Sequence, residues 1–145
     1  MKVLELYSGN EWGKSVFKEF GFEVISCRLD IFDYSIRPRD GFDIVFININ
    51  GNHLGLYDDI DLGDLEFALD AVEYYEPKYW IINHTNKKVW DDIMVWGLPY
   101  QQIQLMRGGK LIPRRVWTNI SKWEPKYNKI YFKETYILLE LLEHI

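Results

Sequence analysis

The fold of this chain is decided by residues 4–24, LELYSGNEWGKSVFKEFGFEV. An apolar run leads into a turn that contains Gly9, and apolar residues then recur every four positions from Trp12 to Phe20. This spacing predicts a helix, which Gly21 can end in a left-handed conformation. A second apolar run follows. A strand, a glycine turn, a helix and another strand predict the start of an α/β sheet, and such a turn can hold a nucleotide-type cofactor.

The next part of the sequence continues the alternation of strands and helices. Residues 43–49 and 79–83 are short apolar runs, which are typical of central parallel strands. Between them, apolar residues at helical spacing over 65–72 predict an amphipathic helix. Asp61 or Asp64 is expected as its N-cap, because aspartate accepts hydrogen bonds from the first turn of a helix.

The last third of the sequence predicts a hairpin and a closing helix. Residues 100–106 and 111–120 are apolar-rich and flank RGGK, a sequence suited to a tight hairpin turn. A C-terminal helix is expected over about 130–145. The chain is therefore predicted to be a single domain, 1–145, with a mostly parallel α/β sheet, helices on both faces and a closing antiparallel hairpin.

Composition limits the classes of function. The 145 residues are 48% hydrophobic and 17% aromatic, which is enough for one domain with an apolar core. A net charge of −5 argues against a broadly basic nucleic-acid surface. The only cysteine is Cys27, which suits a reducing compartment. Because no run of about 18 apolar residues and no signal-peptide pattern occur, we expect a soluble intracellular protein with no membrane partner.

Four stretches, in this order along the chain, resemble motifs of the DNA cytosine-5 methyltransferases, especially the small phage-type enzymes. They are residues 4–24 quoted above, DIVFININGNHLG (43–55), PKYWIINHT (77–85) and IPRRVWTNI (112–120). The resemblance implies a Rossmann-like S-adenosylmethionine-dependent methyltransferase fold over most of the chain. It also implies S-adenosylmethionine as cofactor, DNA as substrate, and a phage or other viral source, so that the protein would reside in a bacterial or host cytoplasm or in a virion.

The catalytic positions of that family are replaced. In the family a cysteine thiolate attacks cytosine and a glutamate supports the ring nitrogen. These positions fall on Gly51 and Asn83. Glycine offers no nucleophile, and an amide cannot act as a carboxylic acid. Cys27 lies at the end of the second predicted strand and is expected to be a small buried hydrophobe. No catalytic residue is therefore predicted.

The cofactor positions are altered as well. The second glycine of the family's loop falls on Glu11, and the acidic residue that ends its second strand falls on Arg28. Glu11 would repel the methionine carboxylate, and arginine has no acceptor for ribose hydroxyls. Tyr7, Gly9 and Asp30 remain as vestigial cofactor-binding residues. We expect no cofactor, with S-adenosylmethionine bound only if the site is intact.

Two further groups of polar residues are candidates for binding nucleic acid or a metal ion. Four cations gather on the predicted hairpin: Arg107, Lys110, Arg114 and Arg115. They could contact nucleic-acid phosphates, or they could be the protective charges of a solvated hairpin edge. His53 and His84 follow two strands expected to be neighbours, with Asp58 nearby. Their spacing matches no metal motif, so no metal site is predicted.

Three functions remain open from the sequence. The first is a catalytically inactive DNA cytosine-5-methyltransferase-like protein, kept as a binding or structural module with a protein partner or a second copy of itself. The second is an active S-adenosylmethionine-dependent DNA methyltransferase with atypical motifs. The third is a nucleic-acid-binding protein that uses the hairpin cations. Cofactor binding, salt-dependent affinity for DNA and oligomerisation would distinguish them.

Overall fold

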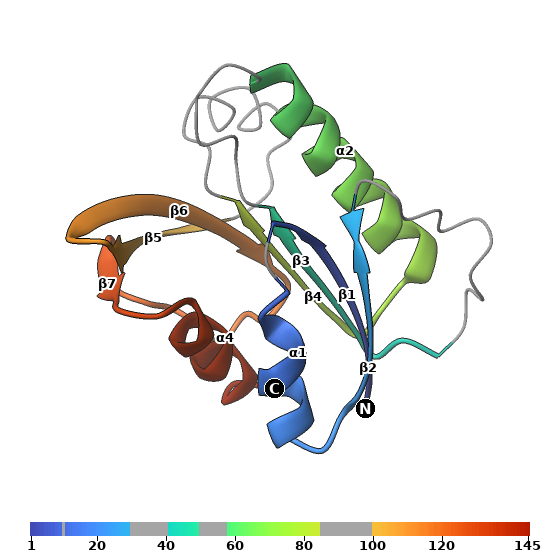
Figure 1. Cartoon of the computed structure of the whole chain (residues 1–145). Coiled ribbons are helices and arrows are strands. Elements are labelled where there is room, and N and C mark those ends of the chain that lie inside the picture. Colours follow the sequence, from blue (N-terminus) through green and yellow to red (C-terminus); the bar gives the residue numbers. More distant parts are fainter. Residues whose placement is uncertain (10, 30–40, 50–57, 85–99) are drawn as a thin grey trace.

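A computed structural model describes residues 1–9, 11–29, 41–49, 58–84 and 100–145, and of residues 58–65 it describes the backbone. In this part of the chain one sheet has the strand order β2-β1-β3-β4-β6-β5-β7 (Figure 1). The strands are β1 (Lys2–Ser8), β2 (Glu23–Arg28), β3 (Ile44–Ile49), β4 (Tyr79–His84), β5 (Tyr100–Arg107), β6 (Lys110–Thr118) and β7 (Lys129–Tyr131).

The strand directions confirm the predicted fold class. Strands β2, β1, β3 and β4 are parallel, whereas β6 is antiparallel to both β4 and β5. The chain passes from β1 to β2 on one side and then places β3 on the other side of β1. Ligands of open α/β sheets bind at the carboxyl ends of the strands beside such a reversal of strand order. The architecture is the Rossmann-like one that the family resemblance implied, with a closing antiparallel hairpin.

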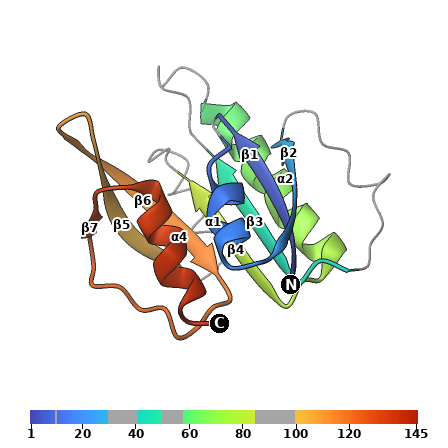
Figure 2. The ribbon, with the colours of Figure 1, turned by 60° about the horizontal axis from the view of Figure 1, so that its bottom comes forward.

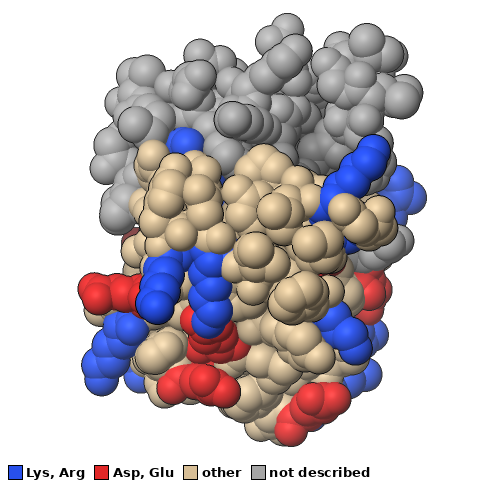
Figure 3. Space-filling model, turned by 90° about the vertical axis from the view of Figure 1, so that its left-hand side faces the viewer, with Lys and Arg blue, Asp and Glu red and all other residues tan. Residues whose placement is uncertain are grey.

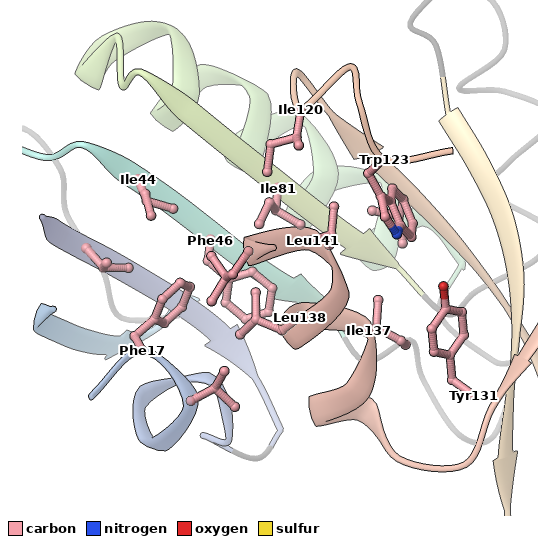
Figure 4. Packing of buried hydrophobic residues seen from close by; sticks show 14 of the residues in the cluster. Phe17, Ile44, Phe46, Ile81, Ile120, Trp123, Tyr131, Ile137, Leu138 and Leu141 are labelled. Carbon is pink, nitrogen blue, oxygen red and sulfur yellow. The ribbon is translucent and has the colours of Figure 1, made fainter. Parts of the chain in front are cut away.

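Helices cover both faces of the sheet (Figure 2). Helices α1 (Gly13–Glu19) and α4 (Glu134–Leu142) lie on one face, and α2 (Asp58–Tyr75) lies on the other. Successive side chains of β3 therefore enter two different cores. Ile44 and Phe46 pack with residues of α1 and α4, and Val45 and Ile47 pack with residues of α2. Figure 4 shows the first of these cores, where Phe17 and Phe46 approach Leu138 and Leu141.

The end of α1 is set by a glycine, as predicted. Gly21 has a φ of 77°, and its N–H donates to the carbonyl of Lys18 at 2.9 Å. The N–H of Phe22 donates to the carbonyl of Phe17 at 3.1 Å, and the two rings stack with centroids 6.4 Å apart. These two bonds and the apolar contact form a Schellman motif, which satisfies carbonyls that the helix leaves unpaired.

The hairpin turn is also confirmed. Gly108 and Gly109 have φ values of 57° and 76°, and Arg107 pairs with Lys110 across the turn. Two successive residues with positive φ are what a type I′ turn requires.

Two expected helix boundaries were wrong. Helix α2 begins at Asp58, so Asp61 and Asp64 lie inside the helix and neither is its N-cap. Acidic residues are favoured in the first turn because the helix dipole is positive there. Helix α4 is shorter than 130–145, because Lys129–Tyr131 form β7 and pair with β5. None of the helices in the described residues is both long and apolar enough to cross a bilayer.

Candidate functional site

Three polar side chains lie side by side at the carboxyl ends of the parallel strands. Tyr7 of β1 is the register partner of Asn48 of β3, and Asn48 is the partner of Asn83 of β4. Asn48 follows Phe46 by two residues and Asn83 follows Ile81 by two, so both asparagines lie on the face that α1 and α4 cover. Asn48 and Asn83 are fully buried, and Asn83 Nδ2 donates to Asn48 Oδ1 at 3.0 Å.

This asparagine pair leaves two amide groups unsatisfied. Within the part of the chain that the structure describes, Asn48 Nδ2 and Asn83 Oδ1 have no hydrogen-bond partner. Each unpaired buried polar group costs about 1–3 kcal/mol of stability. One donor and one acceptor are thus held side by side at the edge where ligands of this architecture bind.

Among the residues that the structure describes, neither catalytic position of the family provides an acid or a nucleophile beside this pair. Asn83 occupies the position that the resemblance assigns to glutamate, and an amide does not ionise near neutral pH as a carboxyl group does. Gly51, at the position of the nucleophile, lies outside the described residues. Cys27 is half-buried and packs against the apolar cluster under α2, on the opposite face of the sheet from Asn48. Its thiol therefore cannot replace the family's nucleophile.

Gly9 and Tyr7 lie at the carboxyl end of β1, where the resemblance placed cofactor-binding residues. Gly9 has a φ of 91°, in the left-handed region that favours glycine. Tyr7 is half-buried at the end of β1, and burial followed by the nearby carboxylate of Glu11 raises the pKa of its hydroxyl. Glu11 is exposed and lies 3.7 Å from the amine of Lys14. Gly9 therefore has the backbone conformation that the predicted glycine turn requires, and an acidic residue follows two positions later.

The other predicted cofactor residues are divided between the described and undescribed parts. Arg28 ends β2 and is the register partner of Tyr7, so the basic residue does lie at the carboxyl ends of the strands. Asp30 lies outside the described residues. The prediction that S-adenosylmethionine is not bound stays a prediction.

The structure makes Glu5 a central residue of the α1 face, a role that was not predicted from the sequence. Glu5 is 1% exposed, and Ser26 Oγ donates to its Oε1 at 2.7 Å. Burial raises the pKa of the Glu5 carboxyl, while Ser26 and the backbone N–H groups of Gly13 and Lys14 oppose the shift. The sequence signal for the contact between Glu5 and Gly13 was an acidic residue inside an apolar strand, followed by a glycine at the start of the next helix.

We predict that Glu5 makes stability depend on pH in a definite direction. A raised folded-state pKa means that the folded protein binds the proton more tightly, so the contribution of Glu5 is full below the ordinary value of 4.5. It is lost as the pH rises through the folded-state pKa. The unfolding free energy of the wild type minus that of Glu5→Gln should therefore fall as the pH rises from about 4.5. Urea unfolding of both proteins between pH 4 and 8 measures this difference.

A matched control is Glu23→Gln, because Glu23 is exposed at the start of β2. Its difference from wild type should stay nearly constant over the same pH range. A Glu5→Gln difference that is equally constant would contradict the assigned cause.

The hairpin cations do not form the exposed cluster expected from the sequence. Arg114 is fully buried, and its Nη2 lies 2.8 Å from Glu134 Oε1. Arg107 contacts the same carboxylate. Burial, with a smaller effect of Arg107, lowers the pKa of Arg114 to about 9, so its guanidinium stays charged at pH 7.

The other two cations lie in different surroundings. Arg115 is 6% exposed, and its guanidinium carbon lies 3.8 Å from the centre of the Tyr100 ring. Lys110 is exposed beside the turn. Arg114 is thus buried against Glu134, and Arg115 is buried against Tyr100. Neither guanidinium faces solvent, where it could contact a phosphate.

The histidines do not build a site in the described part of the chain. His84 is fully buried at the end of β4, and His53 lies outside the described residues. Asp58 is part of α2. Among the residues that the structure describes, no three side chains of His, Cys, Asp or Glu come together to hold a metal ion.

A hollow of about 300 Å³ lies beside the hairpin strands and is bordered by Tyr100, Thr118 and Trp123. Neither Asn48 nor Asn83 borders it. This hollow is therefore separate from the polar pair at the carboxyl ends of the strands.

Comparisons with known proteins give likenesses of the fold. No protein-family model matches the sequence, and a search of curated proteins finds no match. A human methyltransferase 10 domain containing protein is 8% identical, with a TM-score of 0.41 over 80% of this chain and 70% of that chain. A triple mutant of Spodoptera frugiperda DNMT2 is 14% identical, with a TM-score of 0.42 over 92% of this chain. The chain spans 55% of the length of the insect protein. Because both TM-scores are below 0.5, the function is inferred from the residues of the site.

Proposed function

We propose that the chain is a methyltransferase-like binding module that does not transfer a methyl group to C5 of cytosine. The asparagine pair carries this proposal. Asn83 stands where the resemblance places the glutamate, and its amide is hydrogen-bonded to Asn48 at 3.0 Å inside the protein. A buried amide pair can recognise a ligand but cannot move a proton during a reaction.

The unsatisfied groups of this pair support binding over a purely structural role. Asn48 Nδ2 and Asn83 Oδ1 are buried and find no partner among the described residues, and an unpaired buried polar group lowers the stability of a protein. Two apolar side chains of similar size in place of Asn48 and Asn83 would avoid that loss of stability. A ligand that presents an acceptor next to a donor, such as an amide or the edge of a base, would satisfy both groups.

The decisive experiment measures methyl transfer and cofactor binding together. Purified protein is incubated with radiolabelled S-adenosylmethionine and with DNA or RNA, and it is titrated by calorimetry with S-adenosylmethionine and S-adenosylhomocysteine. We expect no methyl incorporation and no binding heat at millimolar cofactor. Micromolar binding without incorporation would keep the non-catalytic assignment and make the cofactor a ligand. Methyl incorporation into either nucleic acid would overturn the proposal and establish the enzyme alternative.

The variant Tyr7→Ala locates any cofactor that does bind. Tyr7 lies at the carboxyl end of β1, beside Asn48 and Arg28. Its replacement should weaken binding at this edge, whereas Tyr136→Ala, an exposed residue of α4, should leave such binding unchanged.

A further inference from the structure

The segment 122–136, KWEPKYNKIYFKETY, forms the outer edge of the sheet and the first turn of α4. It carries aromatic side chains that a folded protein ordinarily covers. Tyr127 is 76% exposed, Phe132 is 68% exposed and Tyr136 is 47% exposed. They lie before β7, directly after it and in α4. We call this region the β7 surface. Several large exposed aromatics in one short segment mark a binding surface.

The β7 surface is basic in an acidic protein. The segment has four lysines and two glutamates, whereas the whole chain has a net charge of −5. All four lysines are exposed: Lys122, Lys126, Lys129 and Lys133. Lys129 is paired with Glu140 at 2.7 Å. Glu134 is engaged by Arg107 and Arg114, so much of its charge is neutralised. Figure 3 faces this side of the molecule and shows Lys and Arg side chains on both sides of a tan area.

A hollow adjoins the β7 surface. It has a volume of about 340 Å³, and its border includes Trp12, Arg107, Phe132 and Lys133. Lys133 is the N-cap of α4, and no side chain caps the helix there. The positive end of the helix dipole favours negative charge at this place, and Glu134 in the first turn supplies part of it. The hollow thus combines two aromatic side chains with Lys133 and with the ion pair of Arg107 and Glu134. Its volume suits a small ligand such as one nucleotide.

We propose that the β7 surface binds single-stranded nucleic acid. Unpaired bases would stack on Tyr127, Phe132 and Tyr136, and phosphates would lie against the exposed lysines, as in other proteins that hold single strands without reading their sequence. A duplex keeps its bases stacked on one another and offers none to these rings. The proposal stands on this surface alone and does not depend on whether the chain transfers methyl groups.

A second copy of the chain is a poorer occupant of this edge. Antiparallel pairing of β7 with its copy would bring Lys129 and Lys133 of each chain close to the lysines of the other. Like charges that face each other across strands are destabilising, and lysines on an edge strand oppose such pairing. Polyphosphate chains, in contrast, are attracted by the same lysines.

The test is fluorescence anisotropy with labelled 12-nucleotide oligo(dT), oligo(U) and a duplex of the same length, in low salt. We expect the single strands to bind and the duplex to bind at least tenfold more weakly. Phe132→Ala and Tyr127→Ala should each weaken single-strand binding about tenfold, because one stacked base is lost. Phe20→Ala is the matched control, since Phe20 is a 41% exposed aromatic at the C-cap of α1, and it should bind like the wild type.

Salt dependence tests the lysines separately. Lys126→Gln should lower the slope of log affinity against log salt by about 0.7, the value for one phosphate contact on a single strand. Lys18→Gln, an exposed lysine of α1, should leave the slope unchanged. Thermal unfolding should be the same for all variants, because every substituted side chain is exposed.

Three results would overturn the proposal. The first is duplex binding as tight as single-strand binding. The second is unchanged affinity in both aromatic variants. The third is no binding to any oligonucleotide, together with a dimer in sedimentation that Tyr127→Ala and Phe132→Ala dissociate. That last result would assign the surface to a second copy of the chain.

Discussion

Gly13→Ala is expected to lower the unfolding free energy by about 3 kcal/mol or more, because it overfills a closed space. A Cβ on Gly13 would lie 2.2 Å from Glu5 Oε2 and 2.9 Å from a ring carbon of Phe46. Neither neighbour can move aside easily. Glu5 is held by Ser26, and the Phe46 ring lies edge-on to Trp12, with centroids 5.3 Å apart.

Urea unfolding followed by circular dichroism measures this loss. Lys18→Ala is the matched control, since it also places alanine on α1 but at an exposed position, and its effect should stay within about 0.5 kcal/mol. The double variant Gly13→Ala/Glu5→Ala should be more stable than the sum of the two single losses predicts, by about 1 kcal/mol or more, because the carboxylate that clashes is gone. If Gly13→Ala is as stable as Lys18→Ala, then Gly13 is not packed closely against Glu5.

Glu134→Ala is expected to destabilise the protein by about 3 kcal/mol, because it leaves the guanidinium of Arg114 without a counter-charge. Arg114 is fully buried, and no described residue accepts a hydrogen bond from its Nε or Nη1. Glu134 is 13% exposed at the 2.8 Å contact. We place the loss near the lower end of the range for broken buried pairs, since water partly reaches this carboxylate.

Arg107→Gln is the control for Glu134→Ala. Arg107 contacts the same carboxylate but is 45% exposed, so its loss should change stability by less than about 1 kcal/mol. Arg114→Met in the Glu134→Ala background should recover much of the stability, because no unpaired charge then remains inside. Equal losses for Glu134→Ala and Arg107→Gln in urea unfolding would contradict a buried role for Arg114.

The elements that the sequence predicted well are those that local chemistry sets. Gly21 ends α1 and the two glycines of RGGK form the hairpin turn, because a positive φ is a property of the residue itself. The run at residues 44–49 is apolar on both faces, and β3 is buried throughout. Strand β7 was missed because three residues carry no visible alternation. Its pairing with β5 depends on contacts distant in sequence.

The sequence predicted where residues of the candidate site lie along the strands, but it did not predict which side chains they contact. The resemblance placed Asn83 at the end of a strand, where the structure has it. The hydrogen bond to Asn48 follows from the parallel register of β3 and β4, which neither segment specifies alone. From the sequence, Arg114 was expected to be a surface cation. Its partner Glu134 lies twenty residues further along the chain, so only the folded structure shows their contact. Gly51 and Asp30 lie outside the described residues, so their predicted roles stay predictions.

The position of α4 has a consequence for the protein during its synthesis. The core of the α1 face joins Phe17 and Phe46 to Leu138 and Leu141, so its two halves come from opposite ends of the chain. At about 5–20 residues per second, a ribosome needs on the order of ten seconds to pass from α1 to α4. During that interval the apolar face of β1 and β3 lacks its cover, and we expect the nascent chain to be bound by chaperones that shield exposed strands.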